Sequence, residues 1–411
     1  MTALWSLLLI WSGLARAHGG FPWATDVSFP PDDPEHPVVV TTFGLLAQEE
    51  SGEWGWVCEE VVGTIGMTAF VAVEDGVWLA GGVDGIYRSA DRCSWSRTGP
   101  PTDDLYVTSF LRDAYTPGRL WATTGTGDAD NALFSSDDNG LTWQVAHSFG
   151  SDLTLRMVIQ DPDSARLAAL SWRDGLPSLW LTEDRESWTE IPLTVNEDAL
   201  VYPLAFDDEG RVWLHAPDPY EDTLMRVAPD GTAETILVSD YKITAFDLGP
   251  GETVVYGTQE EGLHASLDGG ASWTTADAAP VPNCLRSQGD TRWICAHNWS
   301  DEAAVLSTPR QGTDPAEWEW QSELWFGDVH HMQTCDAEST TATVCGPLWE
   351  TVAASSGLDL TRYEPDTGGT SDKESGCGCS TAPGSGRAVG IALLAAISAA
   401  AVARRTPKTV A

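Results

Sequence analysis

The chain repeats one pattern of apolar and polar positions seven times. In each copy a small or hydroxyl residue precedes two bulky apolar or aromatic residues, one variable position and usually another small residue. The copies start at Gly44, Gly85, Ala132, Ser178, Thr223, Gly262 and Ala304. A period of about 40 to 50 residues, filled with short strands and turns rich in Gly and Asp, is typical of a four-stranded repeat unit.

Further strand patterns precede most copies. An upstream strand opens at a residue such as Arg, as in Arg119–Trp121 and Arg211–Leu214, and an innermost strand precedes it, as in Ala69–Val73. Long helical periodicity is absent between the two chain ends. The pattern predicts an all-β fold, a seven-bladed β-propeller over 37–354.

Counting strands predicts how this ring closes. Six units are complete between 66 and 323. The segments 37–62 and 328–350 remain, and the second of them is expected to form strands at Val329–Cys335 and Ala342–Trp349. The seventh blade is therefore predicted to combine strands from both ends of the chain, which removes exposed sheet edges.

The 20 tryptophans fit the same plan. Flat aromatic side chains fill the gaps between twisted neighbouring sheets and cover hairpin turns. A stripe of Trp side chains is also a surface on which sugar rings stack, so the packing role is the first interpretation and glycan stacking the second.

Two repeats carry a polar motif after the common strand, S-x-D-x-G-x-x-W. Its residues are Ser136, Asp138, Gly140 and Trp143 in one copy, and Ser266, Asp268, Gly270 and Trp273 in the other. The motif resembles the Asp-box, or BNR repeat, of β-propellers with the sialidase and sortilin-like architecture. That resemblance implies a structural role, in which Ser and Asp cap a hairpin turn, Gly adopts a left-handed conformation and Trp packs over the turn.

The N-terminus predicts export. Residues 1–17 form an apolar run that ends in Ala15-Arg16-Ala17, a small-x-small pattern at which a signal peptidase cleaves. The mature chain is then expected to begin at His18, with an N-terminal extension over 18–36 before the propeller.

The C-terminus predicts a membrane tail, after a flexible linker over 355–375. Within 376–411, Cys377-Gly378-Cys379 precedes the uncharged apolar stretch Ala388–Ala403 and the basic pair Arg404-Arg405. This arrangement resembles the MYXO-CTERM sorting signal. The resemblance implies cleavage by a sorting protease and attachment to the outer surface, or outer membrane, of a Gram-negative bacterium; a plain membrane anchor is the alternative.

Charge narrows the choice of partners. The chain has 61 acidic and 22 basic residues. All 61 acidic residues but only 17 of the basic ones lie between the predicted signal peptide and the C-terminal tail. This negative field repels phosphate backbones, so nucleic acid is excluded as a partner. Solubility explains the acidity; calcium binding is conceivable but does not follow from composition, and no cofactor is predicted.

Six cysteines outside the tail predict disulfides, because the chain is exported and their number is even. We expect the local pairs Cys284–Cys295 and Cys335–Cys345, which leaves Cys58 to bond with Cys93. None of the six cysteines has the CxxC spacing that is typical of a metal site. His330 and His331 lie side by side, and adjacent strand residues point to opposite faces, so no metal site is predicted there either.

Sequence motifs do not reveal an enzyme. The Arg-Ile-Pro motif of sialidases is missing, as are G-x-S-x-G and H-E-x-x-H. The first hypothesis is a non-enzymatic scaffold that binds a protein or glycan at one mouth of the ring, or on loops such as Asp128–Asp130 and Pro217–Tyr220. The alternatives are a secreted glycan hydrolase, which would need two carboxylates at the mouth, and an assembly factor for envelope complexes.

Overall fold

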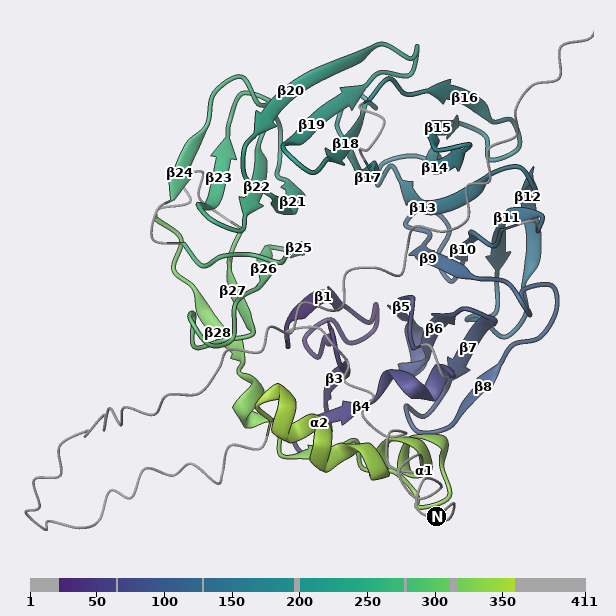
Figure 1. The fold of residues 1–411 in the computed structure, drawn as a ribbon, viewed down its shortest axis with the longest axis vertical. Coiled ribbons are helices and arrows are strands. Elements are labelled where there is room, and N and C mark those ends of the chain that lie inside the picture. Colours follow the sequence, from purple (N-terminus) through teal and green to yellow (C-terminus); the bar gives the residue numbers. More distant parts are fainter. Residues whose placement is uncertain are drawn as a thin grey trace, which may run out of the picture. The chain divides into compact units, whose positions relative to one another are not determined.

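The computed structural model describes residues 22–63, 66–127, 129–195, 200–276, 279–310 and 317–358. These residues lie in the compact unit Met1–Glu364; the second unit, Pro365–Ala411, is outside the described ranges. The described residues form seven sheets, placed around a centre like the blades of a propeller (Figure 1). The predicted all-β, seven-bladed fold is thereby confirmed.

Blades 1 to 6 are antiparallel sheets of four strands, each in sequence order from the centre outward. Blades 1 to 3 comprise β5 (Ala69–Ala72), β6 (Trp78–Gly82), β7 (Gly85–Ser89), β8 (Trp95–Arg97), β9 (Val107–Arg112), β10 (Leu120–Thr124), β11 (Asn131–Ser136), β12 (Gln144–Gly150), β13 (Thr154–Gln160), β14 (Leu167–Arg173), β15 (Leu176–Thr182) and β16 (Thr189–Pro192). Blades 4 to 6 comprise β17 (Tyr202–Phe206), β18 (Val212–Pro217), β19 (Asp222–Val227), β20 (Ala233–Ser239), β21 (Ile243–Leu248), β22 (Val254–Thr258), β23 (Gly262–Ser266), β24 (Thr274–Ala276), β25 (Cys284–Gln288), β26 (Thr291–Cys295), β27 (Val305–Pro309) and β28 (Gln321–Leu324).

Blade 7 closes the ring differently from the prediction. Its sheet has the order β1 (Ala24–Ser28), β2 (Val38–Thr41), β3 (Gly44–Gln48), β4 (Trp54–Val57) and β29 (His331–Met332). The N-terminal end supplies four strands, and the innermost one comes from the segment predicted to be an extension. The C-terminal end adds only β29, which runs parallel to β4 at the outer edge.

The segment expected to form a strand over Ala342–Trp349 is helical, so that prediction is wrong. It contains α1 (Thr340–Cys345), a 3-10 turn over Gly346–Leu348 and α2 (Trp349–Ser356). The Ser339 hydroxyl caps α1 by accepting a hydrogen bond from the backbone N–H of Ala342. Val352 of α2 packs into the core of the closing blade. Shorter 3-10 turns occupy Glu59–Val62, Glu74–Gly76 and Phe326–Asp328.

The helices also change the disulfides. Cys284 bonds to Cys295 as predicted, between paired positions of β25 and β26. The other two predicted pairs are wrong, because Cys58 bonds to Cys345 and Cys93 to Cys335. A strand over 342–349 would have put Cys335 and Cys345 side by side, whereas α1 carries Cys345 to the end of β4. Both bonds therefore fasten the C-terminal segment, over blades 7 and 1.

Tryptophans fill the core of several blades. Trp56, Trp78 and Trp213 are among the largest side chains that are fully buried. The ring of Trp78 lies against Phe70 and Trp95 of the same blade at centroid distances of 5.6 and 6.3 Å. For these residues the packing interpretation holds.

Within the described ranges, no helix has the length and apolarity needed to cross a bilayer. The predicted signal peptide, Cys377-Gly378-Cys379, Arg404 and Arg405 lie outside those ranges.

Candidate functional site

The ring has two faces, because successive strands of a blade run in opposite directions. One face carries the turns between first and second strands and between third and fourth strands, and we call it the turn face. The other face carries the loops between second and third strands and the connections between blades, and we call it the loop face. The first strands of all seven blades lie nearest the centre (Figure 1).

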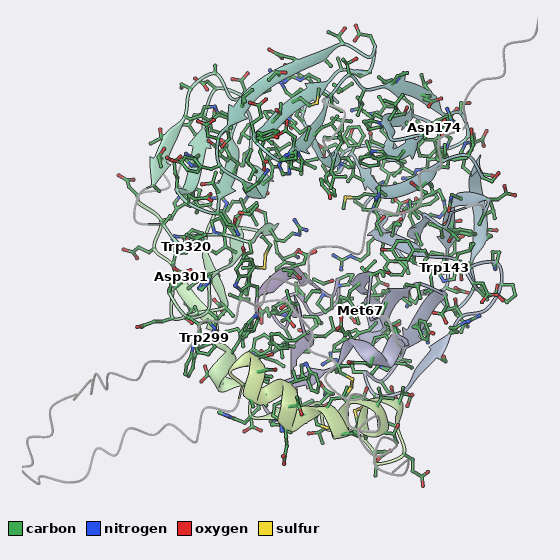
Figure 2. The ribbon with its side chains drawn as sticks, viewed as in Figure 1. Met67, Trp143, Asp174, Trp299, Asp301 and Trp320 are labelled. Atoms are coloured by element: carbon green, nitrogen blue, oxygen red, sulfur yellow. A yellow bond between two sulfur atoms is a disulfide. The ribbon has the colours of Figure 1, made fainter. Side chains whose placement is uncertain are left out.

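The first motif copy closes a turn on the turn face. The Ser136 hydroxyl donates to Asp138 (2.8 Å) and accepts from the Gly140 N–H (3.0 Å). Asp138 also accepts from the N–H and hydroxyl of Thr142 at 2.8 and 2.6 Å. Gly140 has a φ of 75°, and a Cβ there would lie too close to the Leu79 side chain, so both the backbone and the packing favour glycine. Trp143 lies on the outer part of its blade (Figure 2).

The second copy uses the same bonds. Asp268 accepts from the hydroxyls of Ser266 (2.7 Å) and Ser272 (2.6 Å), while the Ser266 hydroxyl accepts from the Gly270 N–H at 2.8 Å. The hydrogen bonds from Ser272 and Ser266 lower the pKa of the Asp268 carboxyl to about 2. Trp273 packs edge-on against Tyr256 at 4.8 Å. Because both oxygens of Asp268 are engaged within the turn, this motif does not present a carboxylate for chemistry.

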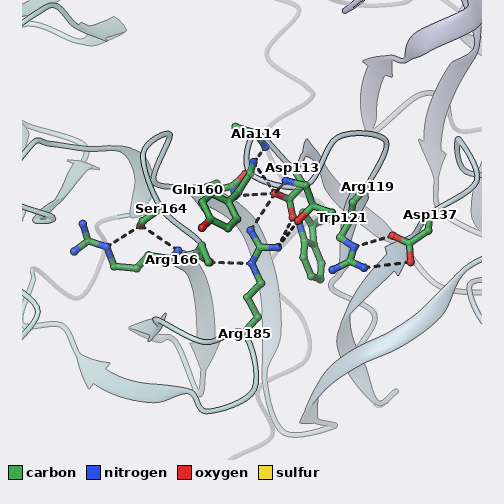
Figure 3. Close-up of polar contacts among 12 residues, drawn as sticks. Asp113, Ala114, Arg119, Trp121, Asp137, Gln160, Ser164, Arg166 and Arg185 are labelled. Atoms are coloured by element: carbon green, nitrogen blue, oxygen red, sulfur yellow. Dashed lines mark hydrogen bonds and ion pairs between the residues drawn. The ribbon is translucent and has the colours of Figure 1, made fainter.

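A buried network joins blades 2 and 3 on the same face (Figure 3). The Asp113 carboxylate, fully shielded from solvent, contacts the Arg185 guanidinium at 2.6 Å. It also accepts from Trp121 Nε1 and Gln160 Nε2, each at 2.9 Å. Burial raises the pKa of Asp113, but the hydrogen bonds from Gln160 and Arg185 outweigh it and lower the pKa overall. The network is a structural tie between blades.

A groove of about 550 Å³ lies on the turn face between blades 4 and 5 and includes Asp268 in its wall. Several of its charged side chains are paired with one another or with near neighbours. Asp207 accepts from Arg211 at 2.7 Å, and Arg226 donates to Glu234 at 2.9 Å. These pairs hold turns and strands together, so the groove's size alone does not make it a binding site.

The loop face has a smaller pocket, about 250 Å³, at the mouth of the ring. Its walls come from five innermost strands, β1, β13, β17, β21 and β25, together with His215 of β18. Apolar side chains such as Met157, Leu204 and Phe246 contribute much of the lining. None of the described lining residues is Asp or Glu.

Three polar groups in this pocket have no partner among the described residues. The Tyr202 hydroxyl and the Asn283 side-chain amide make no hydrogen bond to any described residue, and neither does Nδ1 of His215. The other ring nitrogen, Nε2, donates to the buried Asp222 carboxylate at 2.9 Å. That bond fixes the imidazole and leaves Nδ1 as an acceptor when the ring is neutral.

The charges around the pocket are balanced locally. Arg286 is paired with Asp26 of β1 at 2.7 Å. Lys242 is paired with Asp222 at 2.8 Å, and its ammonium group also donates to the Asp218 carbonyl. Burial raises the pKa of Asp222, but hydrogen bonds from His215 and Lys242 outweigh it and keep the carboxylate ionised.

The sequence did not single out Tyr202, His215, Asn283 or Arg286, although it did place a candidate loop at Pro217–Tyr220. A usable signal existed, since Tyr202 and Asn283 lie at the beginning of first strands, where side chains reach the mouth. Of the loop Asp128–Asp130, Asp128 lies outside the described residues. Among the described residues, no group of three His, Cys, Asp or Glu side chains is placed to hold a metal ion.

Comparisons with known proteins show the fold and no more. No protein-family model matches the chain, and no curated protein does. The GH74 xyloglucanase of Xanthomonas campestris is similar in structure, with a TM-score of 0.52 and 16% identity over 75% of this chain. The match spans only 55% of the xyloglucanase.

Two further similar structures are YCF48 bound to D1 peptide and YCF48 from Cyanidioschyzon merolae. Their TM-scores are 0.49 and 0.46, at 15% and 16% identity, over 70% of this chain in both cases. The matches span 92% and 94% of those chains. At such identities the likeness concerns the propeller architecture alone.

Proposed function

We propose that this chain is an exported, surface-anchored β-propeller that binds a protein or glycan ligand without chemically changing it, using the loop-face pocket. The observation that carries the proposal is that the Tyr202 hydroxyl, the Asn283 side-chain amide and Nδ1 of His215 share one pocket and make no hydrogen bond to any described residue. These three groups remain open to solvent in the pocket, and a few polar groups that converge on one pocket with apolar walls can fix the orientation of a ligand.

Export and anchoring rest on other features. Three disulfides are consistent with an oxidising compartment. The apolar segment 1–17 and the MYXO-CTERM-like tail support a route to the cell surface, and the two Asp-box matches support kinship with Asp-box propellers. Mass spectrometry of both chain ends from an outer-surface fraction tests this part; an intact tail in the inner membrane would contradict it.

Binding is favoured over hydrolysis by the chemistry of the pocket. Glycoside hydrolysis normally uses two carboxyl groups flanking the bond that is cleaved. The described lining has none, and the adjacent Asp26 and Asp222 are already paired with Arg286 and Lys242.

Calorimetry on the full chain with a panel of oligosaccharides and peptides tests the binding function. A Tyr202→Phe/Asn283→Ala variant is expected to lose the binding that the unchanged chain shows. Chromatography of the same mixtures should show every probe intact; ligand cleavage, or binding that survives the double substitution, would contradict the proposal.

A further inference from the structure

We infer that the loop-face pocket takes an uncharged sugar unit, and that a longer oligosaccharide continues from it over Tyr241 and Tyr220. This inference rests on the proposed binding function and specifies its ligand. It is carried by the charge balance of the pocket, by the kind of polar group it offers and by the exposed tyrosines beside it.

Charge excludes the ionic ligand classes. The cationic groups at the pocket, Arg286 and Lys242, are each neutralised by a carboxylate within 3 Å. A further anion would therefore find no free cation, and it would also meet the field of a chain with a net charge of −39. A cation would need a free carboxylate, and the described lining provides none. An uncharged ligand meets neither obstacle.

The polar groups distinguish a hydroxylated ligand from an apolar one. An apolar ligand would bury Tyr202, Asn283 and Nδ1 of His215 without hydrogen bonds, which is unfavourable. A sugar hydroxyl both donates and accepts, and so do a tyrosine hydroxyl and an asparagine amide, while Nδ1 of His215 accepts. Sugar hydroxyls can therefore pair with each of these three kinds of group.

The apolar lining fits the remainder of a sugar. Met157, Leu204 and Phe246 contribute apolar surface to a pocket of about 250 Å³. Small-ligand pockets combine such apolar surface with a few polar groups that fix orientation. This pocket lies below the ~300 to 1,000 Å³ of sites for larger ligands, so it suits a single ring.

Two exposed tyrosines extend the surface outward. Tyr220 is 86% exposed and Tyr241 is 39% exposed. They are joined through Lys242, which follows Tyr241 and donates to the Asp218 carbonyl, while Asp218 accepts from the Tyr220 N–H at 2.7 Å. Ile243, the next residue, lines the pocket. An aromatic face that starts beside the pocket is suited to stacking on the next sugar rings.

The test uses the full chain and calorimetry. The probes are neutral tetrasaccharides of β-linked glucose, mannose, galactose and N-acetylglucosamine, a uronic-acid tetramer, and cationic and neutral tetrapeptides. At least one neutral tetrasaccharide should bind, more tightly than its monosaccharide. The affinity should fall about tenfold in Tyr202→Phe and in Asn283→Ala, since each change removes one buried hydrogen bond to the sugar.

Tyr220→Ala should lower the affinity for the tetrasaccharide but not the affinity for the monosaccharide. The matched control is Tyr115→Ala, because Tyr115 is also exposed, at 60%, but follows β9 on the turn face. That variant should bind like the unchanged chain. Tyr202→Phe removes one oxygen and keeps the ring, so the test remains decisive even if Asn283→Ala folds poorly.

The outcomes separate this inference from the proposed function. Pocket-dependent binding of the uronic acid or of a peptide, with no neutral sugar bound, overturns the inference and leaves the binding function standing. If the affinity of no probe changes in Tyr202→Phe or in Asn283→Ala, both this inference and the proposed binding function are overturned. A neutral sugar that binds and is cleaved supports the ligand class and overturns the non-enzymatic function.

Discussion

The turn face and the loop face use polar side chains in opposite ways. On the turn face, Asp113, Asp138 and Asp268 are each surrounded by donors from the protein itself. On the loop face, Tyr202 and Asn283 lie in a pocket without an internal partner among the described residues. The larger groove lies on the turn face and the smaller pocket on the loop face. A search for volume and a search for unpartnered polar groups therefore select different candidate binding sites.

This difference shows where stability and binding can be changed separately. A group whose bonds are all internal contributes to the free energy of folding, and its removal leaves a buried partner unsatisfied. A group with no internal bond contributes little to folding and remains available to a ligand. Substitutions on the turn face should therefore lower stability, whereas substitutions in the loop-face pocket should lower ligand affinity and leave stability nearly unchanged.

The largest expected effect is on the turn face. Arg185→Leu leaves the Asp113 carboxylate buried without its cation, and loss of one partner of a buried ion pair typically costs about 3 to 5 kcal/mol. Urea unfolding followed by tryptophan fluorescence measures it. Arg119→Leu is the control, because its pair with Asp137 is half exposed and should contribute less than about 1 kcal/mol. Equal losses in the two variants would refute the structural role of the network.

Removing the disulfide Cys58–Cys345, which fastens the C-terminal segment to blade 7, should have the next largest effect on the free energy of unfolding. The double variant Cys58→Ala/Cys345→Ala is expected to lose about 2 to 4 kcal/mol, because the bond closes a loop in the unfolded chain that Cys93–Cys335 shortens but that remains longer than the loop closed by Cys284–Cys295. The matched variant Cys284→Ala/Cys295→Ala removes a bond over 11 residues and should lose less. The same urea experiment compares them, and the reverse order would contradict this account.

Low pH should reduce the contribution of the turn face to the stability of the fold. The folded-state pKa of Asp268 is about 2, below its ordinary value near 4, so its contribution to stability is full above pH ~4 and is lost as the pH falls toward 2. The Asp268→Asn variant should be less stable than the unchanged chain at pH 6, and this difference should shrink between pH 4 and 2. A difference independent of pH would exclude the carboxylate as its source.

The smallest effect on stability is expected in the pocket. Asn283→Ala should change the free energy of unfolding by less than about 0.5 kcal/mol, since the side-chain amide has no internal hydrogen bond to lose. Thermal unfolding monitored by circular dichroism is sufficient to detect a larger change. A loss above 1 kcal/mol would mean that the amide is a structural group, and would remove it from the candidate site.

Much of the architecture was predictable because it is local and repeated. Alternating apolar residues, turn glycines such as Gly140, and the Ser and Asp residues around them determine each hairpin within a few positions along the chain. The partnership of Cys284 with Cys295 followed from the same short-range pairing of neighbouring strands. The ring of seven blades then followed from counting these units.

The closure and the site were decided by contacts between residues far apart in sequence. Whether 340–356 forms a strand or helices depends on what blades 7 and 1 leave to be covered, and that choice also determined the partners of Cys58 and Cys93. The pocket combines strands from five blades, so no local pattern contains it. The sequence by itself determined the repeating blade. Only the tertiary structure decided the bonds Cys58–Cys345 and Cys93–Cys335 and which polar side chains remain free for a ligand, because both depend on long-range packing.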